Sequence, residues 1–425
     1  MTLATWMSFA RAGQELTRFT GVTVGTTTVR RMTEKAGAAF VAVQTAEAAR
    51  ITREAPPAPQ GPAVQFLSVD GAMVPLVGGT WTEVRTLAVG EVVVREARTR
   101  RDRERTVHTE HLSYFSRLCD HETFGQLAGV ETQRRGTETA GVVCAVADGA
   151  PWIQGVVDLH RPDAVRILDW PHALEYVARV GAAVYGADTA AAAVWLARQK
   201  RTLLTDTPTG VLAEMRRLRS LLEPVAQGGT ALLVWTVAPE RGQGGSVPLT
   251  GMLGPEMARR ALEVVRESLG YLEPRVAQMR YAAFRAADYP VGSGSIESAN
   301  KLLVEARLKG AGRHWARAHV NPLVALRTVA YNDRWTEAWP QITTQQRTEA
   351  RTCSTARRQT RLHALESTVA ETAPAAGVNE TQVQLAVLPL APSTLPLTKP
   401  SPPRVHKPAA DHPWRHGSLR RPRCA

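Results

Sequence analysis

Cysteine is scarce in this sequence. Its four cysteines, Cys119, Cys144, Cys353 and Cys424, lie far apart and form no Cys-x-x-Cys pair. This spacing argues against a structural zinc site or a disulfide framework, and it favours a reducing cytosol. The chain also lacks an apolar run near the roughly 20 residues that a membrane-spanning helix needs, and its first residues do not resemble a signal peptide. We therefore expect a cytoplasmic protein without membrane association.

Acidic residues are outnumbered by basic ones. The sequence has 39 Asp and Glu against 52 Lys and Arg, which gives a formal net charge of +13. Only 21% of the residues are charged, so the excess does not come from unusual polarity. A polyanionic partner is the natural inference, and nucleic acid fits better than a membrane surface. A chain of 425 residues, 44% of them hydrophobic, is long enough for two or three domains.

The first 54 residues predict a helical region. Ser8 is a candidate cap for one helix, which ends at Gly21, and the threonine cluster 26–28 begins a second helix. The pair fits either a DNA-binding helix-turn-helix or a plain helical hairpin, and both interpretations stay open. The basic side chains of the second helix are candidate DNA contacts: Arg30, Arg31 and Lys35.

After a proline-rich linker at 55–62, the pattern changes to strands and indicates an α/β fold. Strands that pass from a β-meander into strand-helix-strand units imply a mixed sheet with helices on its faces. The predicted strands are 64–69, 73–77, 81–94, 106–115, 141–147 and 165–168, and the predicted helices are 122–132, 152–159 and 171–185.

The rest of the chain divides by composition. Residues 63–185 form the first part of the core, and 186–280 read as an almost wholly helical insertion interrupted by the Gly-rich 241–245. Residues 281–345 complete the core with C-terminal helices. Residues 346–425 are rich in Thr, Pro and Arg, so we expect a disordered basic tail there.

Glu297 lies in the first turn of a helix that follows a Gly/Ser turn. At 100° per residue, Glu297 shares a side of this helix with Asn300 and Lys301. An acid held on a rigid element beside cations suits a metal ligand facing a phosphate, although acids in first turns also complement the helix dipole. The opposite, apolar side is formed by Ile296, Ala299, Leu302, Leu303 and Ala306.

Three aspartates directly follow predicted buried strands: Asp70, Asp148 and Asp169. Asp-Gly, found at two of them, is also the commonest turn dipeptide. If the first and fourth strands of the sheet are neighbours, acids at their ends lie side by side, and a helix on the sheet can supply a third. Clustered carboxylates need a cation. Oxygen ligands select magnesium or manganese, and two such ions about 4 Å apart support phosphodiester chemistry.

Four segments carry a resemblance to a known family. They are FLSVDGAMVPL around Asp70, ADGAPWI around Asp148, ILDWPHA around Asp169, and GSGSIESANK around Glu297. In this order they resemble bacterial insertion-sequence transposases of the ISKra group, which are relatives of the Mutator-like superfamily. The resemblance runs from roughly Thr5 to Trp339. It implies a cytoplasmic, nucleoid-associated protein that binds DNA and works as a homo-oligomer.

The resemblance further implies an RNase H-like core whose Asp, Asp, Glu triad holds two Mg²⁺ or Mn²⁺ ions. Asp70 matches the first acid and Glu297 the last. Asp148 is favoured as the second because it ends the strand 141–147, which matches the fourth strand of such a core, while Asp169 is the alternative. Asp169 and His172 resemble an Asp-x-x-His element that supports the site or contacts DNA, although His172 also fits a helix start.

The function implied is a DNA transposase that binds its element ends, hydrolyses phosphodiesters and joins the freed 3′-hydroxyl to target DNA. The alternatives are a DNA-binding protein without catalysis, either inactive or domesticated, and a structure-specific nuclease.

Several other residues are expected at the surface. Asp158 and His160 are expected there, and residues 95–105 are expected to form a charged hairpin tip. Candidate phosphate contacts near the acids are Lys301, Arg307, Lys309, Arg313 and His314.

Overall fold

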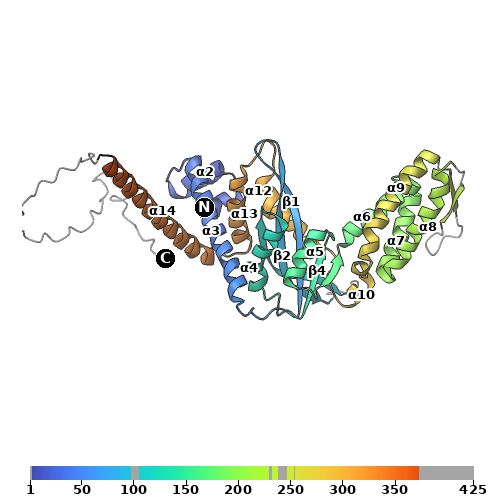
Figure 1. Ribbon diagram of the computed structural model, residues 1–425. Helices are drawn as coiled ribbons and strands as arrows, with labels where there is room; N and C mark the ends of the chain where they lie inside the picture. Colours follow the sequence, from blue (N-terminus) through green and yellow to red (C-terminus); the bar gives the residue numbers. More distant parts are fainter. Residues whose placement is uncertain (1, 97–104, 229–231, 238–246, 253, 373–425) are drawn as a thin grey trace, which may run out of the picture. The chain divides into compact units, whose positions relative to one another are not determined.

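The computed structural model describes residues 2–96, 105–228, 232–237, 247–252 and 254–372, and contacts join the chain up to Thr360 into one compact unit. At its centre is a five-stranded sheet in the order β3-β2-β1-β4-β5 (Figure 1). Strands β1 to β3 pair antiparallel, whereas β4 is parallel to β1 and β5 to β4. The predicted α/β class with a mixed, helix-flanked sheet is confirmed. The strands are β1 Val64–Pro75, β2 Trp81–Arg95, β3 Thr106–Arg117, β4 Val142–Ala147 and β5 Val165–Leu168.

Strand β1 is continuous through Asp70 and Gly71, so the predicted break there is wrong. Asp70 pairs with Thr86 and Gly71 with Arg85 of β2. A Cβ on Gly71 would lie 2.2 Å from Glu83 Oε1. This glycine therefore permits a close approach within a strand instead of forming a turn. The chain turns later, at Gly78 and Gly79, whose φ values are 96° and 82°.

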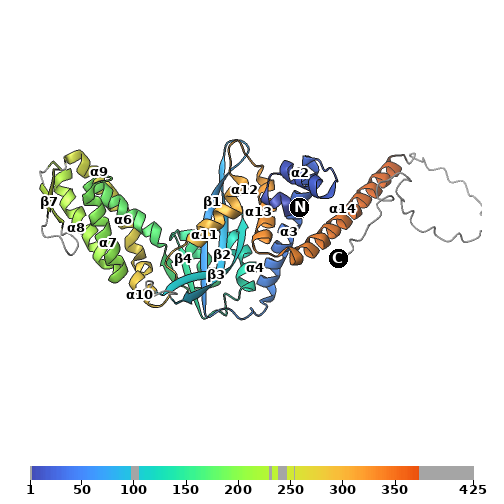
Figure 2. The ribbon, with the colours of Figure 1, turned by 180° about the vertical axis from the view of Figure 1, so that it is seen from behind.

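Each face of the sheet is covered by its own helices. On one face, Leu67 and Val69 pack with α4 (His121–Arg134) and α5 (Pro151–His160). On the other face, Ala72 and Val74 share a core with α6 (Trp170–Tyr185) and with the segment after Gly294. That segment comprises α11 (Gly294–Ala299), η2 (Asn300–Glu305) and α12 (Ala306–Leu308). Figure 2 shows α11 and α12 over β1 and β2.

The predicted N-terminal helices are present. They are α2 (Phe9–Thr20) and α3 (Thr26–Glu54), and a further short helix, α1 (Thr2–Trp6), precedes them. The Ser8 side chain caps α2, and Gly21 ends it in the left-handed conformation. The middle of α3 is core, because Ala36, Ala39 and Phe40 pack against α13 (Arg317–Tyr331) and the start of α14 (Trp335–Thr372). A Cβ on Gly37 would lie 2.1 Å from Pro322 O, so α3 and α13 meet backbone to backbone.

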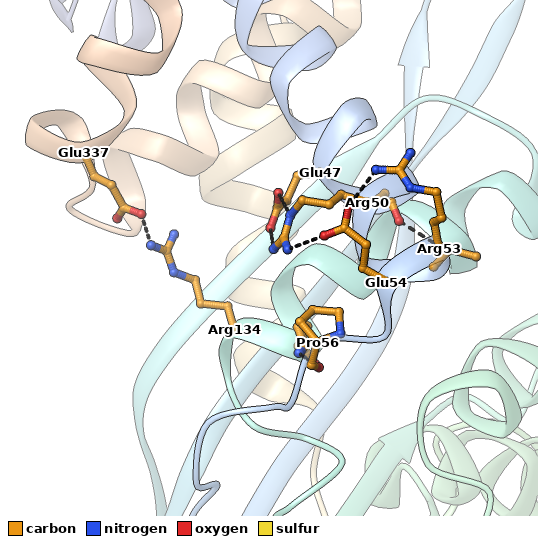
Figure 3. A network of polar contacts seen from close by, with 10 residues as sticks. Glu47, Arg50, Arg53, Glu54, Pro56, Arg134 and Glu337 are labelled. Carbon is orange, nitrogen blue, oxygen red and sulfur yellow. Dashed lines mark hydrogen bonds and ion pairs between the residues drawn. The ribbon is translucent and has the colours of Figure 1, made fainter.

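Residues 55–62 are attached to the core and are not a free spacer. Gln133 Nε2 of α4 donates to Pro56 O at 2.7 Å, and Gly61 N donates to Thr139 Oγ1 at 2.8 Å. Beside them, Arg50 bridges Glu47 and Glu54 at the end of α3, and Arg134 of α4 pairs with Glu337 of α14 (Figure 3). The linker is therefore bonded to the segment 63–185, and Arg117 of that segment also donates to Gln44 Oε1 of α3 at 2.6 Å.

The insertion contains helices and one strand pair. The helical part is α7 (Ala190–Thr205), α8 (Pro208–Ala226), α9 (Pro255–Leu272), η1 (Glu273–Met279) and α10 (Tyr281–Ala286). Between α8 and α9 the backbone forms an antiparallel pair, β6 (Leu232–Val237) with β7 (Val247–Met252), which the helical prediction missed. The apolar, β-branched 232–237 suits a strand. The Gly-rich 241–245 lies outside the described residues.

The predicted start of a disordered tail at residue 346 is wrong, because α14 runs from Trp335–Thr372. Residues 341–372 contain neither Gly nor Pro and are rich in Arg, Ala and Gln, which have high helix propensity. The rest of the predicted tail, 373–425, lies outside the described residues, as does most of the predicted tip at 95–105. Among the helices described, none is long and apolar enough to cross a membrane.

The buried Arg327 links the N-terminus to η2. Its side chain is 2% exposed, and Nε donates to Leu303 O at 2.6 Å. Its other nitrogens donate to Leu302 O and to Thr5 O of α1. Because η2 is a π-helix, whose bonding pattern differs from that of an α-helix, a side chain that satisfies its carbonyls stabilises this turn. One guanidinium therefore fixes α1, α13 and η2 together.

We predict that Arg327→Met lowers the free energy of unfolding by about 3 kcal/mol, because it leaves three buried carbonyls without their donor. The urea midpoint measures the loss. Arg317→Met, at an exposed position of the same helix α13, is the matched control and should change stability by less than about 0.5 kcal/mol. Equal midpoints for both variants would contradict this role of Arg327.

Candidate active site

The strand register brings two of the predicted acids together. Leu67 of β1 lies opposite Ala145 of β4 in the parallel ladder. Continued by three residues, this register sets Asp70 opposite Asp148, which directly follows β4. Asp70 is therefore in the middle of a strand, whereas Asp148 and Asp169 follow strands as predicted. On the Asp70 face, α11 and η2 pack over β1 and carry Glu297.

Asp70 is partly buried and held by two donors. Gly71 N donates to its Oδ1 at 2.7 Å, and Asn300 Nδ2 donates to its Oδ2 at 2.8 Å. Burial raises the pKa of Asp70 above its ordinary value, and the charges of Asp148 and Glu297 raise this pKa too, although the two hydrogen bonds lower it. The charges of the other two predicted acids therefore both reach Asp70.

Asn300 was not assigned a role from the sequence. The only signal was its position three residues after Glu297, on the predicted polar side of that helix. In the structure Asn300 is 5% exposed, and its Oδ1 is buried without a hydrogen-bond partner. An unpaired buried acceptor beside a carboxylate whose pKa is raised by its neighbours suits a cation.

The donor set at Asp70 fits a hard divalent cation. It offers carboxylate oxygens and one amide oxygen, which are the ligands that Mg²⁺ and Mn²⁺ prefer. Among the residues that the structure describes, no group of three or more His, Cys, Asp or Glu side chains is placed to hold a metal ion. The candidate site is thus a loose set of acids around Asp70, whose pKa the charges of Asp148 and Glu297 help to raise.

The Asp148 loop is held by the insertion. The hydroxyl of Tyr271 on α9 donates to the Asp148 carbonyl, and Arg275 donates to Gly149 O at 3.1 and 2.9 Å. The Arg275 guanidinium lies 4.0 Å from the Tyr271 ring, which stacks on Tyr176 of α6 at 4.0 Å. Gly149 has a φ of 78°, a conformation that favours glycine. Sequence analysis missed Tyr271 and Arg275, because they lie over 120 residues from their partners.

Asp169 is the N-cap of α6. It is 3% exposed, its Oδ2 accepts from His172 N at 3.1 Å, and its Oδ1 accepts from Ser293 N at 2.5 Å. Trp170 N also donates to Val291 O at 2.9 Å. Both Asp169 oxygens thus anchor backbone, including the loop that leads to Glu297. This use of its carboxylate favours Asp148 over Asp169 as the second ligand, and that choice stays a prediction.

His172 occupies the first turn of α6 and packs among aromatic rings. Its imidazole meets Tyr176 and Tyr271 edge to face at 5.5 and 5.6 Å. Its Nδ1 lies 3.6 Å from the Glu175 carboxylate. His172 therefore lies beside Tyr271, which holds the Asp148 loop, whereas Asp169 is the N-cap residue of α6.

The predicted faces of the Glu297 helix hold for only one turn. Ile296, Ala299 and Leu303 are buried as expected, but Leu302 is 47% exposed and Ala306 is also exposed. Because the π-helix η2 inserts wider turns between Asn300 and Glu305, the buried side shifts to Val304 and Leu308. The polar side keeps Glu297 and Lys301 exposed.

The prediction that Arg307 contacts phosphate is wrong, because the π-helix η2 turns this residue to the buried side. Its side chain is 4% exposed, it lies 4.7 Å from the Phe9 ring and 5.2 Å from the Trp315 ring, and its Nε donates to Ala4 O. Burial lowers the pKa of Arg307 to about 10. Lys309 pairs with Glu305. The remaining predicted cations are exposed: Arg30, Arg31, Lys35, Lys301, Arg313 and His314.

Two further expectations concern the surface of α5. Asp158 is exposed and pairs with Arg166. The surface prediction for His160 is wrong, because the ring packs between α4 and α5. Its Nε2 lies 2.9 Å from Gly125 O and its Nδ1 3.2 Å from Thr132 Oγ1. Burial lowers the pKa of His160, so its role is structural.

No family model matches this chain, and no curated protein matches it. The case for a function therefore depends on the geometry of the acids and on the residues that hold them.

We predict that Asp70→Asn stabilises the protein at neutral pH. A raised carboxyl pKa means that the folded state binds a proton more tightly than the unfolded state does, so the wild type loses stability as the pH rises from about 3.8 through the raised pKa. Asparagine cannot ionise, and a flip of the Asn300 amide would let its Oδ1 accept from the new side chain. The melting temperatures of the variant and the wild type, followed from about pH 7 down to about pH 4, measure the difference.

The gain should shrink as the pH falls. Asp163→Asn is the control of opposite sign, because Arg161 lowers the pKa of this exposed carboxyl, and its removal should slightly destabilise the protein at neutral pH. A melting temperature for Asp70→Asn below that of the wild type at neutral pH would contradict the raised pKa of Asp70.

We predict that Arg275→Ala loosens the Asp148 loop, because Gly149 O loses its two donated bonds and the Tyr271 ring loses its cation. Amide hydrogen exchange of 148–150 should accelerate at least about tenfold, which corresponds to about 1.4 kcal/mol. Arg216→Ala, which removes the exposed pair with Glu273 in the same insertion, should leave that exchange unchanged. Unchanged exchange in Arg275→Ala would show that the insertion does not hold the loop.

Proposed function

We propose that this protein is a DNA transposase of the Asp, Asp, Glu type. It binds the ends of its own element, hydrolyses phosphodiesters and joins the freed 3′-hydroxyl to target DNA. The observation that carries the proposal is that the register of β4 on β1, continued by three residues, sets Asp148 opposite Asp70, and that the charges of Asp148 and Glu297 add to burial in raising the pKa of Asp70. Acids are seldom clustered without a counter-charge unless they bind a cation.

The topology supports an RNase H-like core. The first and fourth strands are neighbours and run parallel, as the placement of two acids at one sheet edge requires. The helical insertion enters after α6 and returns before α11, between the second and third acids as the resemblance to ISKra-group transposases implies. The segments that carry this resemblance are also the segments that build the candidate site.

In this proposal, Asp70, Asp148 and Glu297 hold two Mg²⁺ or Mn²⁺ ions. When bound, such ions activate the attacking water or 3′-hydroxyl and stabilise the leaving oxygen. Asn300 orients Asp70 through the bond to its Oδ2, and Tyr271 and Arg275 fix the backbone of the Asp148 loop. Asp169 ties the loop before Glu297 to the start of α6. No covalent enzyme nucleophile is needed.

Exposed cations near the candidate acids are proposed to contact the phosphates of the bound DNA. Lys301 lies one turn after Glu297, and Arg313 and His314 follow in the next loop. Their contacts with phosphates would bind DNA without reading its sequence. The exposed Arg30, Arg31 and Lys35 at the start of α3 are proposed to contact the element ends. Two ends must be brought together, so a homo-oligomer on DNA is part of the proposal.

We predict that Asp70→Asn, Asp148→Asn and Glu297→Gln each reduce nicking and strand transfer at least about 1,000-fold, because each removes a charge that the reaction needs. The substrate is a plasmid carrying the DNA that flanks the gene, with Mg²⁺ present. Binding to this DNA should change less than about threefold, because no phosphate contact is lost.

Asp169→Asn is the matched control. It keeps one acceptor oxygen for the α6 cap but loses the acceptor for Ser293 N, so its activity should fall by no more than about tenfold, far less than that of Asp148→Asn. Full activity in Asp148→Asn with loss in Asp169→Asn would mean that the second acid is Asp169. A wild-type protein that binds this DNA but never cuts it would leave a DNA-binding protein without catalysis. Cutting that ignores the flanking repeats would point to a structure-specific nuclease.

A further inference from the structure

The outer part of α14 is an exposed and strongly basic helix. Every residue from 347 to 360 is exposed. This stretch contains four arginines and one acid, Glu349, whose Oε1 accepts from Gln345 at 3.0 Å. An all-polar helix of this kind gains little from packing. Its surface chemistry is therefore set by its charges.

Three of the arginines lie on one face of α14. Arg347, Arg351 and Arg358 are separated by four and seven residues, so at 100° per residue they fall within about 40° of one another. At about 1.5 Å per residue they span roughly 16 Å of helix. We call these three residues the arginine stripe.

Within the described part of the chain, the arginine stripe has no carboxylate partner among the ion pairs of the structure. Arg347 and Arg351 are four residues apart, and like charges at that spacing destabilise a helix. The threonine hydroxyls nearby are used internally, since Thr348, Thr352 and Thr355 each bond the carbonyl four residues earlier. Among these side chains, the arginines are the ones that offer donors to a partner.

The other side of α14 adjoins the basic start of α3. A groove of about 450 Å³ is lined by Lys35 of α3 and by Glu349, Cys353 and Arg357 of α14. Lys35 was already a candidate DNA contact from the sequence. The exposed cations at the start of α3 and those of α14 therefore lie along neighbouring helices.

We propose that the arginine stripe of α14 binds the phosphate backbone of duplex DNA, and that the bound phosphates supply the negative charge that the helix lacks. This inference rests on the proposed function and names one of its DNA-binding surfaces. Charge complementarity selects the partner: phosphates follow one another about every 3.4 Å along each strand, so a 16 Å stripe faces about five of them. The contact is with phosphate and carries no sequence preference.

The test compares the full chain with a variant in which Arg347→Gln, Arg351→Gln and Arg358→Gln are combined. Fluorescence anisotropy measures binding to a random 30-base-pair duplex (a length of ~100 Å at about 3.4 Å per pair) over a range of salt concentrations. The slope of log K against log salt should fall by about 2.7, at about 0.9 per phosphate. Hydrogen exchange of 347–360 should slow when DNA is added to the wild type and not when it is added to the variant.

The charge-matched control combines Arg216→Gln, Arg219→Gln and Arg260→Gln, which removes three cations that already face Glu273, Glu223 and Glu256. Its slope should change by less than about 1. Circular dichroism checks that both variants stay folded.

A triple variant with the wild-type slope and the wild-type change in hydrogen exchange would overturn the stripe while leaving the transposase proposal intact. A wild type that binds no duplex would defeat both proposals. Loss of binding to anionic vesicles without loss of DNA binding would assign the stripe to a membrane surface and overturn the inference.

Discussion

The parallel pairing of β1 with β4 is the constraint on which the candidate site depends. A parallel ladder fixes which residues lie side by side, and its register, continued by three residues beyond Leu67 and Ala145, sets Asp70 opposite Asp148. A shift of one residue would turn the Asp70 side chain to the other face, away from Glu297. The strand is long and paired throughout with β2, so the position of Asp70 is determined by eleven consecutive strand pairs of β1 and not by a loop.

Distant parts of the chain support this pair of strands. Arg327 joins α1 and η2, which carries the Asp70 partner Asn300. Tyr271 and Arg275 hold the loop of Asp148 from the insertion. Buried polar groups of this kind cost free energy unless they are satisfied. Here they hold the Asp70 carboxylate and the Asp148 backbone in place.

Local signals in the sequence were read correctly where one side chain or one short pattern decides the structure. The Ser8 cap, the Gly21 stop and the buried strand 142–147 are examples. The Asp70-Gly71 pair was misread, because pairing with β2 outweighs the turn preference of the dipeptide.

The misread helices have a related cause. The π-helix at η2 moved Arg307 into the core, and no residue pattern marks such a turn. The role of Asp169 as a cap depends on Ser293, which lies 124 residues later. The hydrogen bonds of Tyr271 and Arg275 to the Asp148 loop likewise join residues far apart in the chain. Contacts of this range depend on the tertiary fold, so the sequence could indicate candidate acids but not the residues that contact them.

The most direct measurement of the central claim is the position of a bound divalent ion. Crystals of the full chain soaked in Mn²⁺ give an anomalous difference map that locates the ion independently of any activity. We expect peaks within ligand distance of Asp70, Asp148 and Glu297, with Asp169 still bonded to Ser293. No peak at these three acids, or a peak on Asp169 with its cap broken, would contradict the proposed metal site.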